Sequence, residues 1–158
     1  MIFKVKEDLT INQGEVIYIK KDLSFDFKPV YSGDYSLLIG YISLSFDSET
    51  KCACQVWGCN PINVWVNKCL NKPKSIKGDL VLDDEIETGD NKRFIEAGVW
   101  TTYFDKSTEW VCIGNYEEES NDVAVEFANN TIAVINKNNL KALWLKPKFE
   151  EEIVVLSK

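Results

Sequence analysis

Alternating apolar and polar residues near the C-terminus constrain this chain most, because a period of two is typical of a half-buried β-strand. The segment Asp122–Ala128 (DVAVEFA) directs its valines and its phenylalanine to one face. Asn129-Asn130 follows as a two-residue turn, since asparagine tolerates a positive φ angle. The pattern therefore predicts a β-hairpin whose second strand is Thr131–Asn136.

Two further strands are expected on either side of this hairpin. Glu109–Asn115 (EWVCIGN) alternates in the same manner and precedes an acidic loop. Asn138-Asn139 is a second turn signal, and Leu140–Lys146 (LKALWLK) follows it. Pro147 ends that strand because proline cannot donate to a sheet. The sequence thus predicts a C-terminal four-stranded meander over residues 109–146.

Upstream segments extend the β pattern. Glu15–Lys20 and Thr50–Trp57 are predicted strands, and Tyr35–Phe46 is predicted as one long strand that bends at Gly40. A long bent strand suits a barrel or a strongly coiled sheet. The predicted fold is mainly β: an antiparallel barrel, or a strongly coiled sheet or sandwich, of about 8–10 strands.

One segment departs from this pattern. Asn60-Pro61 resembles a helix N-cap followed by proline at the first helical position. Apolar residues then recur at helical spacing at Ile62, Trp65, Val66, Cys69 and Leu70. The sequence therefore predicts one short helix at about residues 61–71. The competing interpretation is a strand, because the β-branched Ile62, Val64 and Val66 also alternate.

The length of the chain and its N-terminal residues indicate its domain organisation and its cellular location. With 158 residues and no linker or repeat, the chain is expected to form a single domain over residues 1–158. The N-terminus MIFKVKEDLT lacks the apolar core of a signal peptide, and no window is apolar enough for a membrane-spanning helix. A cytoplasmic location is therefore expected, with no membrane partner. The sequence does not determine the oligomeric state.

Charge is distributed unevenly along the chain. The net charge is −7, with +2 in residues 1–78 and −9 in residues 79–158. This asymmetry disfavours nucleic-acid binding and permits a basic protein partner. The carboxylates proposed to contact such a partner are Asp79, Asp83, Asp84, Glu85, Glu87, Asp90, Glu117, Glu118 and Glu119. The alternative is an ordinary solvated surface or a charged sheet edge that prevents aggregation.

Histidine is absent from the chain, which removes the commonest general base and metal ligand. Catalysis by a Ser-His-Asp or Cys-His arrangement is thereby excluded within the chain. Glycine-rich phosphate loops are also missing. The expected function is a non-enzymatic acidic protein-binding module without a cofactor, of the inhibitor or immunity type. Carboxylate, lysine, tyrosine or cysteine chemistry remains the enzymatic alternative.

Four of the five cysteines raise a different hypothesis. Cys52, Cys54, Cys59 and Cys69 form a C-x-C-x4-C-x9-C pattern, and four thiolates could bind zinc. The spacing differs from the usual paired zinc knuckles. Free cysteines also pack as small apolar residues, and this interpretation is favoured over a zinc site.

Aromatic residues provide the second functional candidate. The chain has five Trp, six Tyr and eight Phe. Such residues line ligand pockets and interfaces, although core positions are the commoner use. Trp100, Tyr103 and Trp110 are the pocket candidates, because acidic residues lie close to them in sequence. The alternative hypothesis, which is based on these three residues, is a β-barrel or sandwich that binds a small molecule or a carbohydrate.

Overall fold

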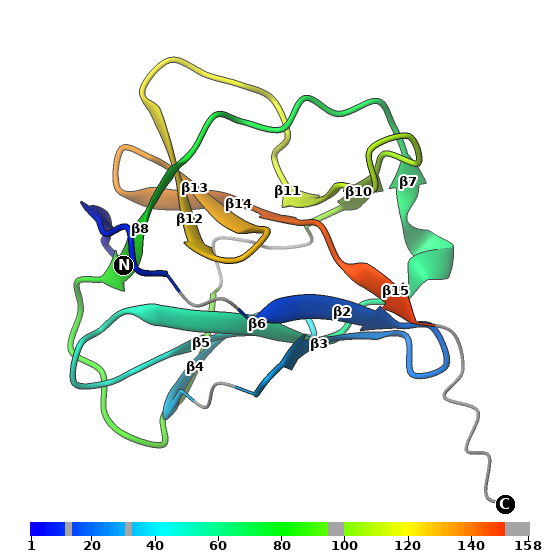
Figure 1. Ribbon diagram of the computed structural model, residues 1–158. Coiled ribbons are helices and arrows are strands. Elements are labelled where there is room, and N and C mark those ends of the chain that lie inside the picture. Colours follow the sequence, from blue (N-terminus) through cyan, green and yellow to red (C-terminus); the bar gives the residue numbers. More distant parts are fainter. Residues whose placement is uncertain (12–13, 31–32, 95–99, 151–158) are drawn as a thin grey trace, which may run out of the picture.

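The computed structural model describes residues 1–11, 14–30, 33–94 and 100–150. Within these residues, fifteen β-strands form an eight-stranded and a seven-stranded sheet. Figure 1 shows the two sheets as stacked layers. The fold is therefore mainly β and resembles a sandwich.

The eight-stranded sheet contains most of the C-terminal strands. Its strands, in spatial order, are β1 (Phe3–Glu7), β8 (Ile76–Leu82), β12 (Asp122–Ala128), β13 (Thr131–Asn136), β14 (Asn139–Leu145), β11 (Val111–Gly114), β10 (Thr102–Phe104) and β7 (Val66–Asn67). Two of its pairings, β12 with β8 and β10 with β7, are parallel.

The seven-stranded sheet is built mainly from the N-terminal half. Its strands, in spatial order, are β15 (Lys148–Glu150), β2 (Glu15–Ile19), β3 (Ser24–Lys28), β6 (Ala53–Cys59), β5 (Ile42–Phe46), β4 (Tyr35–Ile39) and β9 (Asn91–Arg93). β15 and β9 join it through parallel pairings. The chain therefore crosses from one sheet to the other between β14 and β15.

A single apolar core fills the space between the sheets. Both sheets contribute fully buried side chains to it, among them Leu37 and Leu44 from one sheet and Val125 and Leu143 from the other. Burial of this apolar surface is the main stabilising contribution to such a fold.

Aromatic rings close one end of this core. Trp65 is 9% exposed and contacts the rings of Tyr18, Phe25, Phe104 and Phe149, and the ring planes of Trp65 and Phe25 are nearly parallel. These residues come from both sheets and from the β6–β7 connection, so the cluster joins three separate parts of the chain.

Of the predicted alternatives, the mainly β sandwich fits the structure and the antiparallel barrel does not. Neither sheet closes on itself within the described residues, and four of the strand pairings are parallel. The expected 8–10 strands are replaced by fifteen shorter ones. Much of this increase in strand number arises because predicted strands are interrupted by turns that local patterning does not reveal. The predicted long strand 35–46, for example, is a hairpin with Gly40 at its turn and a φ of 61°.

The predicted helix over 61–71 is also wrong. The structure has one 3-10 turn, η1 (Ile62–Val64), followed by the short strand β7. Asn60 does not cap a helix; its side-chain oxygen accepts a hydrogen bond from Trp65 Nε1 instead. No helix among the described residues is long and apolar enough to cross a membrane.

The predicted meander has a different topology. Its four strands are neighbours, but β11 pairs with β14 and does not pair with β12. The order β12-β13-β14-β11 is that of a Greek key, in which the fourth strand is reached by a connection across the end of the sheet. That connection is the acidic loop 115–121, which consequently lies at one end of the sheet.

Candidate functional site

The outer face of the eight-stranded sheet carries a second apolar cluster. Its fully buried members include Cys112, Ile132, Ala142 and Trp144, and Leu70 packs onto them from the β7–β8 connection. Figure 1 shows this connection, in green, running along the side of the sheet that faces away from the other layer. We refer to residues 68–75 as the covering segment, because they shield this face from solvent.

Two hydrogen bonds fix the covering segment to the turn after β10. The Lys68 amide donates to the Phe104 carbonyl (2.9 Å), and the Leu70 amide donates to Asp105 Oδ2 (2.9 Å). Asp105 also accepts bonds from the amide and hydroxyl of Ser107. The Leu70 amide and the Ser107 hydroxyl stabilise the carboxylate, and together these bonds lower the pKa of Asp105 to about 2.

A groove of about 820 Å³ opens between the covering segment and the acidic loop. Its floor includes Ala124, Val134 and Trp144. Lys72 and Lys74 of the covering segment line it, as does Tyr116 of the acidic loop. The groove is therefore apolar at the bottom and carries charges of both signs on its walls.

Lys141 organises the wall formed by the acidic loop. Val134 pairs with Ala142 and Ile135 pairs with Leu140, so Lys141 is the extra residue of a β-bulge. Its Nζ donates to Asp122 Oδ2 (2.6 Å), to Glu119 Oε1 (2.8 Å) and to the Glu117 carbonyl (2.6 Å). The side chain is only 8% exposed, so this cation is almost completely enclosed by acceptors.

The same network changes the acidity of Asp122. Burial alone would raise its pKa, but hydrogen bonds from Lys141 Nζ, Asn136 Nδ2 and the Glu119 amide outweigh burial and lower the pKa of this carboxyl. Glu117, Glu118 and Glu119 all line the groove, and Glu119 is half-exposed. The acidic loop is thus held in one conformation while its glutamates remain accessible.

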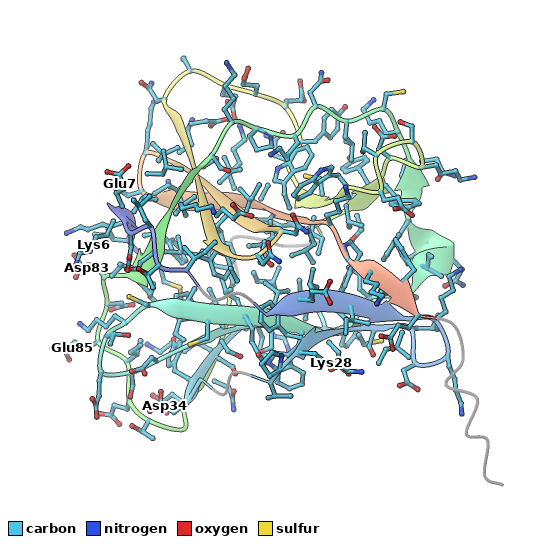
Figure 2. All side chains as sticks on the ribbon, in the orientation of Figure 1. Lys6, Glu7, Lys28, Asp34, Asp83 and Glu85 are labelled. Carbon is cyan, nitrogen blue, oxygen red and sulfur yellow. The ribbon has the colours of Figure 1, made fainter. Side chains whose placement is uncertain are left out.

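The other predicted acidic residues gather around the loop between β8 and β9. Asp84, Glu85, Glu87 and Asp90 line an open hollow of about 580 Å³, which Lys51 and Lys92 also border. Among the described residues, no lysine or arginine lies within ion-pair distance of these four carboxylates. In Figure 2, Glu85 and Asp83 project from the same end of the molecule as Asp34. We call this feature the acidic hollow.

Asp34 ties the loop of the acidic hollow to the β5–β6 turn. Its carboxylate accepts hydrogen bonds from the amide and hydroxyl of Ser48 and from the hydroxyl of Thr88. The bonds from Ser48 are the main reason that the pKa of Asp34 is lowered. Residues far apart in the sequence therefore hold the loop in place.

Asp79 and Asp83 do not belong to the acidic hollow. Asp83 forms an ion pair with Lys4 (2.7 Å), and Asp79 borders a separate hollow near Thr10 and Cys52. Burial, together with the nearby Asp8, raises the pKa of Asp79. The nine acidic residues predicted as one set are thus distributed over different surfaces.

The three aromatic pocket candidates are divided between the two faces of one sheet. Trp100 packs against Phe94 at the core between the sheets. Tyr103 and Trp110 contact the cluster on the outer face. Tyr103 stacks edge-on against Tyr116, which lines the groove. The groove therefore involves Tyr103 indirectly and does not include Trp100.

The cysteines of the zinc hypothesis are also separated. No group of three or more His, Cys, Asp or Glu side chains in the described part of the chain could hold a metal ion. Cys54 is buried, which raises its thiol pKa to about 12, whereas Cys59 and Cys69 are exposed on different elements. A protonated Cys54 is unsuited to nucleophilic attack at neutral pH.

Sequence reasoning missed the residues that shape the groove most directly. Lys141 was assigned to an ordinary strand position, and only a bulge turns it toward Asp122. Tyr116 and Lys72 lie in segments without periodicity. A possible signal was the run Leu140–Lys146, whose apolar residues do not alternate strictly.

The chain belongs to the broad class of two-layer β-proteins. Its surface carries a groove on one sheet and a separate acidic hollow. No protein-family model matches the chain, and no curated protein sequence shows significant similarity to it.

Proposed function

We propose that this protein is a non-enzymatic binding module for a basic protein, of the inhibitor or immunity type. The observation that carries the proposal is the acidic hollow: Asp84, Glu85, Glu87 and Asp90 face one open space without an ion-pair partner among the described residues. Adjacent like charges repel one another and reduce stability. A basic partner would compensate all four at once.

The loop that carries these carboxylates is suited to rapid association. Asp34 connects it to Ser48 and Thr88, so little conformational freedom is lost when a partner binds. Exposed charges of one sign accelerate encounter with a partner of opposite charge, and they do so most strongly at low salt. The proposal therefore predicts fast, salt-dependent association.

Affinity capture with the full-length chain tests this function. The wild type is compared with a variant carrying Asp84→Asn, Glu85→Gln, Glu87→Gln and Asp90→Asn. The matched control neutralises four exposed carboxylates elsewhere, at Glu7, Glu15, Glu49 and Glu109. We expect wild type and control to capture the same basic protein and the hollow variant to lose it.

Association kinetics provide the quantitative measurement. The on-rate of the captured partner should fall by at least about tenfold between low and high salt. The hollow variant should lose most of this salt dependence, and it should also unfold at a higher urea concentration because its self-repulsion is reduced. Equal capture by the hollow variant, or no basic protein captured by the wild type, would contradict the proposal.

The groove supports a second candidate function, the binding of a small molecule. Its volume of about 820 Å³ lies within the range of ligand sites, and Tyr116, which is partly exposed, provides aromatic contact surface. A fragment screen followed by NMR tests this function. Binding should shift resonances of Trp144 and Tyr116, and a screen without such shifts would exclude it.

A further inference from the structure

The outer face of the seven-stranded sheet presents a tryptophan among polar side chains. Ser43 and Ser45 of β5 point away from the core, because the alternate residues Ile42, Leu44 and Phe46 fill it. Trp57 of β6 shares their face and is 43% exposed, the only tryptophan among the described residues that is classed as exposed. Tryptophan is over-represented at protein interfaces, where its ring supplies a large apolar contact area.

Two contacts define how the indole lies. Trp57 pairs directly with Ser43, and its Nε1 donates to Ser45 Oγ (2.9 Å), two residues further along the same strand. Ser43 is only 4% exposed although it points outward, and its hydroxyl has no hydrogen-bond partner among the described residues. We infer that the ring lies over Ser43 with one π face toward the sheet and the other toward solvent.

A carboxylate shares a cleft with this ring. Phe25 pairs with Gly58, and Asp26 and Trp57 are the next residues on their strands, so both lie on the outward face of the sheet. Both residues line a cleft of about 260 Å³. Asp26 has no ion-pair or hydrogen-bond partner among the described residues. The nearest lysine on the same strand, Lys28, pairs with Glu150 across β2 (3.8 Å).

We propose that this cleft binds the guanidinium group of an arginine side chain on the basic partner; the proposal rests on the function proposed above. The planar guanidinium stacks on the free face of Trp57 and donates two hydrogen bonds to Asp26. Val30, which is 76% exposed at the cleft, contacts the methylene stem of the arginine. Arginine and tryptophan are the residues that most often dominate interface energetics.

The chemistry of the cleft selects against other ligands. Among the described residues, no lysine or arginine lines it, so Asp26 is the charged group there that a phosphate would meet. The indole N–H is already used by Ser45, which leaves the ring only its π face for a ligand. A lysine ammonium is a compact, strongly hydrated charge that neither stacks nor bonds a carboxylate through two parallel donors.

The cleft adjoins the acidic hollow. Ser36 of β4 lines the cleft, and its amide donates to the carbonyl of Asp90, which borders the hollow. One basic partner can therefore contact both surfaces at the same time. The acidic hollow then attracts the partner over a long range and mainly affects the association rate. Stacking in the cleft is local and mainly affects the dissociation rate.

A small probe tests the cleft independently of the partner. The full-length chain is titrated with Nα-acetyl-arginine methyl ester and followed by NMR at the Trp57 indole N–H and at the amides of Ser45 and Gln55. We expect saturable shifts, weakened at least about tenfold by Asp26→Asn or Trp57→Ala. Trp57→Phe should retain part of the binding, and Val64→Ala, at an exposed apolar residue elsewhere, should retain all of it.

Matched probes identify the chemistry. The equivalent citrulline ester has nearly the same shape without the charge and should not bind, and the lysine ester should bind more weakly. Equal shifts with citrulline, shifts that survive Asp26→Asn, or saturable binding of glucose or N-acetylglucosamine would overturn the proposal. The absence of any shift with the arginine ester would overturn it as well.

Measurements on the captured partner separate the two proposals. Trp57→Ala should raise the dissociation rate by roughly thirtyfold or more, whereas neutralising the acidic hollow should mainly lower the on-rate. If the hollow variant loses the partner and Trp57→Ala does not, the binding function stands and the arginine site is wrong. If the wild type captures no basic protein, the binding function itself fails.

Discussion

The central strands of the two sheets are buried to a similar extent but differ in what they present outward. In β13 the outward residues are Ile132 and Val134, and they pack beneath the covering segment. In β5 the outward residues are Ser43 and Ser45, and Trp57 extends over them. The degree of burial is therefore a poor guide to the role of a face, and the chemistry of the residues is a better one.

We propose that this difference separates a stabilising face from a binding face. The outer face of the eight-stranded sheet has become a second core, to which the covering segment contributes Leu70. On the outer face of the seven-stranded sheet, the Ser43 hydroxyl has no partner in the described part of the chain, and the Trp57 indole is 43% exposed. Substitutions on the first face should accordingly affect folding, and those on the second should affect binding.

Among the substitutions that test this difference between the two faces, Trp144→Ala should lower the free energy of unfolding most. Trp144 is 1% exposed at the centre of the covered face, and truncation of a buried tryptophan usually costs about 3–5 kcal/mol. Urea unfolding of the variant measures the loss, and Trp144→Phe should lose less. A change below about 1 kcal/mol would mean that the covered face does not function as a core.

Lys141→Met should have the next largest effect. The change leaves Asp122 and Glu119 without their cation, and breaking a buried ion pair costs about 3–5 kcal/mol. Because Glu119 is half-exposed beside an open groove, we expect about 2 kcal/mol in urea unfolding. Adding Asp122→Asn to the variant should recover part of the loss. If it recovered nothing, the stabilising contribution would come from packing of the lysine stem.

The strands around these residues were predictable because their signals are local. The bounds of β12 and β13 match the predicted segments, and Asn130 adopts the positive φ (55°) that its turn requires. The second turn is shifted by one residue, to Lys137 and Asn138, since both adopt positive φ. Alternation and turn chemistry need only neighbouring residues, so they can be recognised in a single sequence.

The errors arise where distant residues decide the structure. The helical spacing around Trp65 is a coincidence, because Trp65 is held by rings from both sheets while Leu70 is buried against a different face. The bulge that redirects Lys141 depends on pairing with β13. Asp26 and Trp57 are thirty-one positions apart in sequence, and the pairing of β3 with β6 brings both to the same cleft. The candidate sites therefore depend on contacts that periodicity does not encode.

Acidification should weaken the covered face, with an effect expected to be smaller than that of Lys141→Met. The folded pKa of Asp105 is about 2, below its ordinary value of 3.8, so its contribution is present above about pH 4 and is lost as the pH falls toward 2. Urea midpoints measured from pH 5 to pH 2.5 should decline over this window. In Asp105→Asn the decline should be shallower, and hydrogen exchange at the Leu70 amide should be faster at every pH. A parallel decline in both proteins would assign the pH dependence to other carboxylates.

Trp57→Ala should change stability least, although it removes the same side chain as Trp144→Ala. The indole of Trp57 is 43% exposed, so truncation forfeits only part of its buried area. It also opens Ser43 to water, and satisfying a buried hydroxyl that lacks a partner recovers about 1–3 kcal/mol. The two terms oppose each other, and we expect a net change within about 0.5 kcal/mol in urea unfolding.

Ser43→Ala should be stabilising in the wild type and neutral once Trp57 is removed, because the unpaired hydroxyl then has access to solvent. A loss above about 2 kcal/mol for Trp57→Ala would instead make the polar face a structural element equivalent to the covered one.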